Sequence, residues 1–435
     1  MYAALMIQSF GRLRRRLWHT AVARSGMLVT ITLMIVLLVL AVGWRAHQKG
    51  QFAKLKTELN KGSVAPVAVT PMPGGQAVMT LQRSQMAGGA NPEFLTATLL
   101  PGRGMNIFQI TAFIPDKGVV NLLASPTLEQ AEALLNHTGP DVSGGASLGM
   151  GAAFEVPWGG KISGVEAADG TMLTTQWRGH RLTLPLDRKQ GNPGSTPMSV
   201  GGLLLAQEST TTQTNVMPDG GEAKATYKSD FEEHWVSQNE ITTTVQLSGK
   251  AMEIKVVARN TGTEAEPMGI GWNPLFSILS GHRGQATLRL PTSLRAEGDR
   301  QTGLPTGKLL PVKGTAYDFT RRGGAPLGSL NLDDSFVHLQ PDPMDSGPIA
   351  ELRDPESNYG LRITATSPSI KAIRVYAPAD KSFVSIQPQL NYDDPLGHEW
   401  EKEDTGMVVL EPGQTAQWRI RLEIFSLSED HAGPI

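Results

Sequence analysis

Acidic side chains and a histidine gather near the end of the chain, between Asp393 and Glu399. Asp393 and Asp394 are adjacent, and His398 precedes Glu399 after a short stretch that contains proline and glycine. Carboxylates beside an imidazole can exchange protons near neutral pH or bind a metal ion. Because proline and glycine are typical of turns, a solvated loop is the favoured interpretation. If an acid/base pair has been displaced to this segment, His398 and Glu399 are its first candidates.

Other kinds of reactive site are excluded by composition. The chain of 435 residues contains no cysteine, which excludes disulfides, thiol catalysis and cysteine-based zinc sites. Gly303-Leu-Pro-Thr-Gly307 is a turn signature and not a phosphate loop, because no Gly-Lys-Ser/Thr follows it. The net charge of -2 argues against a general nucleic-acid binder. We therefore expect neither a metal site nor a nucleic-acid partner.

The elements that would position these residues are strands. Apolar and polar residues alternate with a period of two in many segments after about residue 94, which is typical of half-buried strands. The clearest segments are 95–100, 105–112, 241–247, 251–257, 286–290, 361–365, 372–376 and 416–425. One helix is predicted over 127–135, with Ser125 as its N-cap and Pro126 at its first position. Many strands with so little helix predict an all-β fold, a sandwich or a barrel.

The N-terminal region has a different character. Residues 26–44 are almost wholly apolar and carry no charge, and a helix of that length, about 28 Å, would match a hydrocarbon core of about 30 Å. Several arginines between Arg12 and Arg24 precede it. The positive-inside rule then predicts a single-pass helix in the cytoplasmic membrane, with a cytoplasmic N-terminus and a periplasmic or extracytoplasmic main domain. A signal peptide cleaved near Ala41-Val-Gly43 and a buried core helix are the alternatives.

These observations give a domain plan. Residues 1–25 are predicted to form a cytoplasmic basic segment, 26–44 a transmembrane helix and 45–92 a flexible linker rich in proline and glycine. Residues 93–428 are predicted to form the main domain, and 429–435 a C-terminal tail.

Several short segments of the main domain have a distinctive order and spacing. They are Asn260-Thr-Gly262, Pro267-Met-Gly-Ile-Gly-Trp-Asn-Pro-Leu-Phe276, Gly303–Gly307, Gly314-Thr-Ala-Tyr-Asp-Phe319 and Leu332-Asp-Asp-Ser-Phe336. In this order they resemble the aldose 1-epimerase family, the galactose mutarotase-like sugar enzymes. The resemblance covers roughly residues 94–427. It implies a large antiparallel β-sandwich, the supersandwich of that family, with a sugar cleft on one face and no cofactor.

The resemblance also implies where the chemistry should lie. Mutarotation needs a base for the anomeric hydroxyl and an acid for the ring oxygen. The family uses a Glu on a late strand and a His in a W-H-P-Y-F segment, and here those positions hold Gln387 and Asn273. Gly201 stands where the family has the histidine of H-G-L, and Lys161 where it has the arginine of N-R-I. Neither amide can exchange a proton in the working pH range.

Other family features are kept. Asp333 stands where the family has a carboxylate that accepts hydrogen bonds from sugar hydroxyls, although a plain turn residue is the alternative. Trp158 and Trp272 would stack on the apolar face of a sugar, or else are core residues. Asn273 and Gln387 suit a lectin-like pocket, which needs donors and acceptors but no proton transfer.

Three functions are compatible with this sequence. The first is a membrane-anchored domain that binds a saccharide with weak or no mutarotase activity. The second is an active aldose 1-epimerase, a sugar isomerase that uses shifted residues. The third is a structural interaction module of the cell envelope that binds no sugar.

Overall fold

A computed structural model of the chain describes residues 70–430, except 84–88, 137–143, 188–195, 230, 232–233, 300, 342–344 and 401–402. The chain divides into two compact units, Met1–Thr70 and Pro71–Ile435. The described residues belong almost entirely to the second unit.

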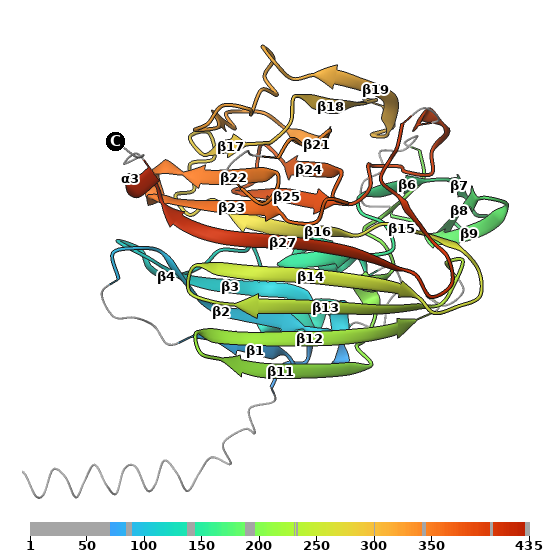
Figure 1. The fold of residues 1–435 in the computed structure, drawn as a ribbon, viewed down its shortest axis with the longest axis horizontal. Coiled ribbons are helices and arrows are strands. Elements are labelled where there is room, and N and C mark those ends of the chain that lie inside the picture. The colour runs from blue at the N-terminus through green and yellow to red at the C-terminus, as the bar shows by residue number, and fades with distance from the viewer. Residues whose placement is uncertain are drawn as a thin grey trace, which may run out of the picture. The chain divides into compact units, whose positions relative to one another are not determined.

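Two large antiparallel sheets make up most of this unit (Figure 1). The first runs in the order β1 (Met79–Gln82), β2 (Glu93–Leu100), β3 (Asn106–Ile114), β5 (Ala152–Glu155), β16 (Gly271–Ser277), β25 (Phe383–Gln389), β24 (Ala372–Ala377), β21 (Leu332–Val337), β18 (Leu294–Gly298) and β19 (Pro305–Pro311), with β4 (Gly118–Asn121) paired to β3. The second runs in the order β11 (Thr211–Met217), β12 (Gly220–Ser229), β13 (Asn239–Leu247), β14 (Ala251–Asn260), β27 (Thr415–Ser426), β23 (Tyr359–Ala365), β22 (Ile349–Asp354), β17 (Thr287–Arg289) and β20 (Ala325–Pro326).

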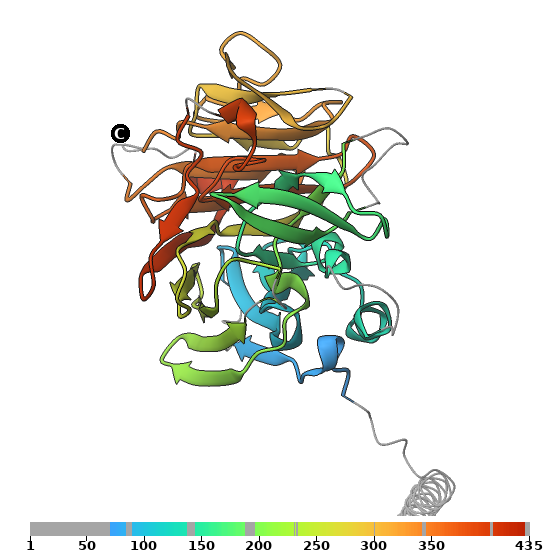
Figure 2. The same cartoon turned by 90° about the vertical axis from the view of Figure 1, so that its right-hand side faces the viewer.

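Smaller elements surround the two sheets. β6 (Lys161–Ser163) pairs with β10 (Met198–Val200), β15 (Glu266–Met268) with β26 (Val408–Leu410), and β7 (Val165–Glu166) with β8 (Met172–Trp177), which continues into β9 (His180–Pro185). In Figure 2 the green ribbons of β8 and β9 face the viewer. The short helices are η1 (Pro73–Gly75), η2 (Pro101–Arg103), α2 (Leu128–Leu135), η3 (Gly145–Gly149), η4 (Leu204–Ala206), η6 (Pro355–Ser357), η7 (His398–Trp400) and α3 (Leu427–Asp430).

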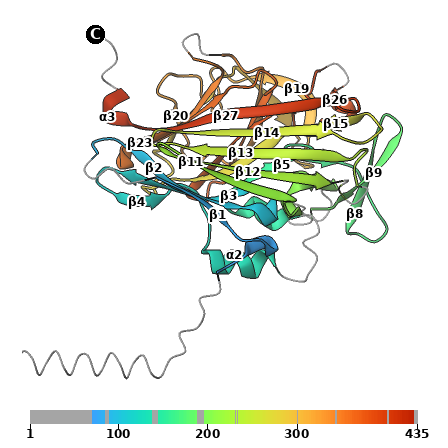
Figure 3. The same ribbon diagram turned by 60° about the horizontal axis from the view of Figure 1, so that its bottom comes forward.

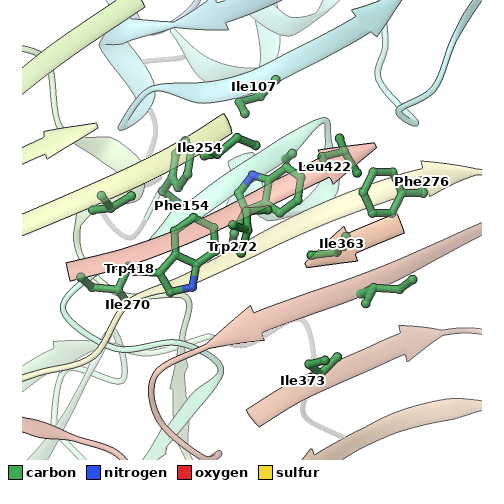
Figure 4. Close-up of a cluster of buried hydrophobic side chains, with 14 of the residues drawn as sticks. Ile107, Phe154, Ile254, Ile270, Trp272, Phe276, Ile363, Ile373, Trp418 and Leu422 are labelled. Carbon is green, nitrogen blue, oxygen red and sulfur yellow. The ribbon is translucent and has the colours of Figure 1, made fainter. Parts of the chain in front are cut away.

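The core lies between the two sheets, where the apolar members of the alternating strands meet. Figure 4 shows Phe154 and Trp272 of the first sheet against Ile254 and Trp418 of the second. Trp418 is fully buried, and its indole N–H donates to the carbonyl oxygen of Pro388 at 3.0 Å. Burying each large apolar side chain stabilises the fold by roughly 1.5–3 kcal/mol. The period-two pattern therefore predicted the all-β part of the fold class correctly, and the architecture is a β-sandwich.

The predicted helix is present, but its N-cap differs from the prediction. The hydroxyl of Thr127 accepts from the backbone N–H of Gln130, and the Gln130 side chain accepts from the N–H of Thr127, which makes a capping box. Thr127, rather than Ser125, is therefore the cap. Ala131 and Leu135 pack on Phe108 of β3, which holds the helix beside the first sheet (Figure 3).

The predicted membrane helix is corrected. The segment 26–44 lies outside the described residues. Within the residues that the structure does describe, no helix is long and apolar enough to cross a membrane. The longest of them, α2, has 8 residues and spans about 12 Å, less than half of a hydrocarbon core of about 30 Å. The transmembrane part of the predicted fold class and the location in the cytoplasmic membrane are withdrawn with it.

The domain boundaries stay a prediction, but the structure adds one detail. β1 lies inside the stretch 45–92 that was predicted to be a linker, and it pairs with β2 over Met79–Gln82. The boundaries at 25 and 44 lie outside the described residues, and the boundary at 428 falls within α3 (Leu427–Asp430).

Candidate functional site

Two of the predicted site residues, Gln387 and Asn273, lie on the same face of the first sheet. Arg374 of β24 is opposite Gln387 of β25, and Ser335 of β21 is opposite Arg374. Asn273 of β16 continues this row, because its side chain contacts that of Gln387. The row lies on the face opposite the core, since successive side chains of a strand alternate in direction and Trp272, beside Asn273, points into the core.

The two amides at the family's acid/base positions are hydrogen-bonded to each other. The amide nitrogen of Gln387 donates to the side-chain oxygen of Asn273 at 3.0 Å and to the hydroxyl oxygen of Ser385 at 2.9 Å. The Ser385 hydroxyl donates to the same Asn273 oxygen at 2.7 Å. The Asn273 amide nitrogen donates to the carbonyl oxygen of Leu148 at 3.2 Å. Gln387 is 1% exposed and Asn273 7%, so this amide pair is a closed, buried arrangement.

A buried arginine connects the amide pair to the carboxylates. The guanidinium of Arg374 donates to the Gln387 side-chain oxygen at 3.1 Å. It also forms ion pairs with Asp333 and, at 3.4 Å, with Asp393. Burial lowers the pKa of Arg374, but the neighbouring carboxylates outweigh this and raise it above its ordinary value. Arg374 is therefore a permanent cation under the site.

Asp333 is the more accessible part of the site, and the buried Lys161 is its ion-pair partner. The Lys161 ammonium donates to the second oxygen of Asp333 at 2.9 Å and to the carbonyl oxygen of Gly303 at 3.2 Å. Burial favours the neutral form of Asp333, but Arg374 and Lys161 outweigh it and lower its pKa. The Asp333 side chain keeps 34% of its surface exposed, compared with 4% for Lys161. Of the predicted contacts, Asp333 is the one that presents a charged group to solvent.

The acidic segment near the C-terminus is part of this cluster. Asp393 is buried, accepts from the Ser335 hydroxyl at 2.9 Å and accepts from the backbone N–H of Lys161 at 3.3 Å. Asp394 is also buried and accepts from the backbone N–H of Ser163 at 2.8 Å. The interpretation as a solvated loop is therefore wrong for these two residues, because β6 packs against them.

The displaced acid/base candidates lie farther along the same segment. His398 is exposed. The pKa of Glu399 is raised to about 7, mainly by burial and also by the charge of Asp394. No hydrogen bond joins either side chain to Asn273 or Gln387 among the described residues. The structure thus does not bring this pair to the amides.

One carboxyl group was missed by the sequence analysis. Glu155 of β5 lies opposite Gly271 of β16, two residues along the strand from Asn273 and on the same face. It is 1% exposed, and its Oε2 accepts from the backbone N–H of Gly160 at 3.0 Å. Burial raises its pKa to about 7, against the opposing effects of the Gly160 N–H and Arg374. Nothing in its sequence context indicated this perturbed group.

The predicted stacking tryptophans are core residues. Trp158 and Trp272 are both fully buried. Trp158 stacks on Trp235 with ring centroids 5.3 Å apart, and Trp272 lies 6.5 Å from Trp418 in the cluster of Figure 4. Neither ring has a free face, so the role in sugar stacking is corrected to the core alternative.

The position of the family's second histidine is closed. Gly201 has φ of +82°, a left-handed conformation that favours glycine, and a Cβ there would lie 2.9 Å from the methyl groups of Leu148. Leu148 is the residue whose carbonyl binds Asn273. A histidine at position 201 would strain the backbone and would require the side chain of Leu148 to shift.

A serine motif in η3 lacks the surroundings of a catalytic nucleophile. Gly145-Ala-Ser-Leu-Gly149 fits the pattern G-x-S-x-G. Ser147 is fully buried, lies in η3 rather than in a strand-to-helix turn, and donates its hydroxyl to the carbonyl oxygen of Leu205 at 3.3 Å. It is a structural residue.

Comparison with known proteins agrees with the architecture. Residues 207–423 match the family model described as aldose 1-epimerase. The fold is similar to a galactose mutarotase-like protein from Clostridium acetobutylicum, with a TM-score of 0.61, 14% identity and coverage of 80% of this chain and 98% of that one. The family match covers just under half of the chain, and the structural likeness shows the fold.

A second solved structure has the same fold. The GalM/aldose epimerase homologue from C. elegans matches with a TM-score of 0.57 and 16% identity, over 76% of this chain and 95% of that one. No curated protein matches the chain. At these identities the structures show the fold, and function has to be argued from the site, because one fold can host many functions.

Proposed function

We propose that this protein binds a saccharide on the polar face of its first sheet and catalyses mutarotation weakly or not at all. The observation that carries the proposal is the hydrogen bond of 3.0 Å between the side chains of Gln387 and Asn273. In this proposal two neutral amides replace the base and the acid of the family. The two amides form a hydrogen bond with each other.

The chemistry of amides explains the expected loss. Neither a carboxamide nitrogen nor its oxygen takes up or releases a proton near neutral pH. Losing a general base or a general acid costs about 10²–10⁴-fold each. Ser385, which bonds to both amides, adds a hydroxyl that is already engaged. The cluster can orient a sugar by hydrogen bonds, but its two amides cannot act as a general acid and a general base.

Asp333 and Lys161 are the proposed principal contacts for the saccharide, with Asn273 and Gln387 beneath them. The ionised Asp333 accepts hydrogen bonds only, which suits sugar hydroxyls, and its partial exposure makes it reachable. Lys161 holds the carboxylate in place and can donate to a further oxygen.

An active epimerase is the second candidate, and Glu155 is the observation that favours it. Its pKa of about 7 is suited to proton transfer at neutral pH. Against this, the backbone of Gly160 covers the carboxyl group and the side chain is 1% exposed. Catalysis through Glu155 would require the Gly160 segment to open.

Polarimetry distinguishes the two candidates. We expect freshly dissolved α-D-glucose and α-D-galactose to mutarotate at the same rate with and without the protein. The double variant Asn273→His, Gln387→Glu restores the family's residue types, and we expect it to accelerate the reaction. Acceleration by the unaltered protein that disappears in Glu155→Gln would refute the proposal and identify the base.

Binding is tested separately with a glycan array. Asp333→Ala should abolish the signal for any bound saccharide. Asp380→Ala is the matched control, because Asp380 is an exposed aspartate paired with Lys381, and it should leave binding unchanged. If no glycan binds, the protein is an interaction module instead and the proposal fails.

A further inference from the structure

The strand β11 forms an unprotected edge of the second sheet. Its residues Thr211–Met217 pair with β12 along one side, and no described strand pairs with its other side (Figure 1). All 7 residues are exposed, and Val216 is 97% exposed. The sequence Thr-Thr-Gln-Thr-Asn-Val-Met contains no charge, no proline and no glycine. Such an edge presents free N–H and C=O groups that can pair with another strand.

The other end strands in the orders of the two large sheets carry features that disfavour pairing. β20 has 2 residues and ends in Pro326. β19 begins and ends with proline and contains Gly307 and Lys308. β1 has 4 residues. Short strands, prolines and lysines are the usual protections of a sheet edge, so β11 differs from the other edges of the same sandwich.

The residues of β11 are complementary to a second copy of the strand. In an antiparallel pair centred on Thr214, Thr212 lies opposite Val216 of the second copy, and Gln213 lies opposite Asn215. Thr214 then lies opposite itself. These pairings place β-branched residues opposite each other and an amide opposite an amide, and the two Thr214 hydroxyls can hydrogen-bond across the axis. At the ends of the strand Thr211 lies opposite Met217. The strand brings no like charges together, because it has none.

We propose that β11 is a homodimer interface in which two copies join their second sheets into one continuous antiparallel sheet. A two-fold axis through Thr214 generates this contact from identical surfaces and closes it at two subunits. β11 belongs to the second sheet, whereas Asn273, Gln387 and Asp333 lie on the first. The proposal is therefore independent of sugar binding.

The absence of cysteine makes a direct test possible. Residues directly opposite in an antiparallel pair have Cα atoms about 4.5–5.5 Å apart, within the range of about 4.4–6.8 Å that a disulfide spans. Thr214→Cys should therefore cross-link two copies under mild oxidation. Val165→Cys is the matched control, because Val165 is also an exposed strand residue, 72% exposed, but lies in the small sheet of β7 to β9.

Sedimentation of the unaltered protein gives the second measurement. We expect a concentration-dependent dimer, and we expect Thr214→Lys to raise its dissociation constant by about tenfold or more, since two ammonium groups then face each other at the axis. Val165→Lys should change nothing. A monomer at every concentration, or a dimer that Thr214→Lys leaves intact, overturns the proposal. Equal cross-linking of the two cysteine variants overturns it as well.

Discussion

Replacing Arg374 with methionine tests whether the buried ion-pair cluster holds the site together. Arg374 forms ion pairs with Asp333 and Asp393 and donates to Gln387, and its side chain is 5% exposed. Methionine is of similar length and leaves these partners in place without their cation. The cost is therefore dominated by uncompensated buried charge rather than by a cavity.

The magnitude follows from burial. Removing one partner of a buried ion pair destabilises a protein by roughly 3–5 kcal/mol, whereas exposed pairs contribute about 0–1 kcal/mol. Asp393 is 10% exposed, and Asp333 keeps Lys161 as a partner. We expect a loss near the lower end of that range, about 3 kcal/mol. The matched control is Arg419→Met, because Arg419 pairs with Glu253 at 3.2 Å but is 53% exposed.

The assay is urea unfolding of both variants followed by tryptophan fluorescence. The sign of the pH effect is a second check. Arg374 lowers the folded-state pKa of Asp333, so its contribution is complete above the unfolded pKa of about 3.9 and is lost as the pH falls through the folded value. The difference in the free energy of unfolding between Arg374→Met and the unaltered protein should therefore become smaller at acidic pH. Equal losses for the Arg374 and Arg419 variants would refute the reasoning.

Three further outcomes are expected from the structure. The pKa of Glu155 is raised to about 7. Its contribution to stability is therefore complete below the unfolded pKa of about 4.3 and is lost as the pH rises toward 7, so the free energy of unfolding falls over this range. Glu155→Gln should make this fall less steep by up to about 1.4 kcal/mol per pH unit in unfolding measurements. Trp272→Ala should cost about 3–5 kcal/mol in urea unfolding, because the ring is fully buried in the core; a loss below about 1 kcal/mol would contradict its placement. Thr127→Ala should cost about 1 kcal/mol through loss of the capping box, with Thr263→Ala, at an exposed threonine, as the comparison.

The strand pattern and the order of the motifs were readable from the sequence, because both are local. Alternation with a period of two follows from strand geometry and predicted an all-β sandwich or barrel. The resemblance then placed Gln387 and Asn273 at related positions, and the structure brings their side chains to 3.0 Å. The membrane helix at 26–44 was predicted from length and hydropathy alone. Among the described residues, no helix is long and apolar enough to cross a membrane.

The faces and the burial of the site residues needed the tertiary structure. Trp272 and Asn273 are neighbours in the chain, but one lies in the core and the other in the polar row, and the motif alone did not say which side of the sheet each would take. Asp393 looked like a loop residue because its partner, Lys161 of β6, is 232 positions away.

The sequence by itself determined the strands and the all-β class of the fold, since these depend on residue identity and short-range periodicity, and it predicted that Gln387 and Asn273 replace the family's acid/base residues. Only the tertiary structure decided that the replacement amides bind each other, that Arg374 and Lys161 hold Asp333 ionised, and that Glu155 has a pKa of about 7. These properties depend on distances between distant segments and on exclusion of water, which arise when the sheets and loops pack together.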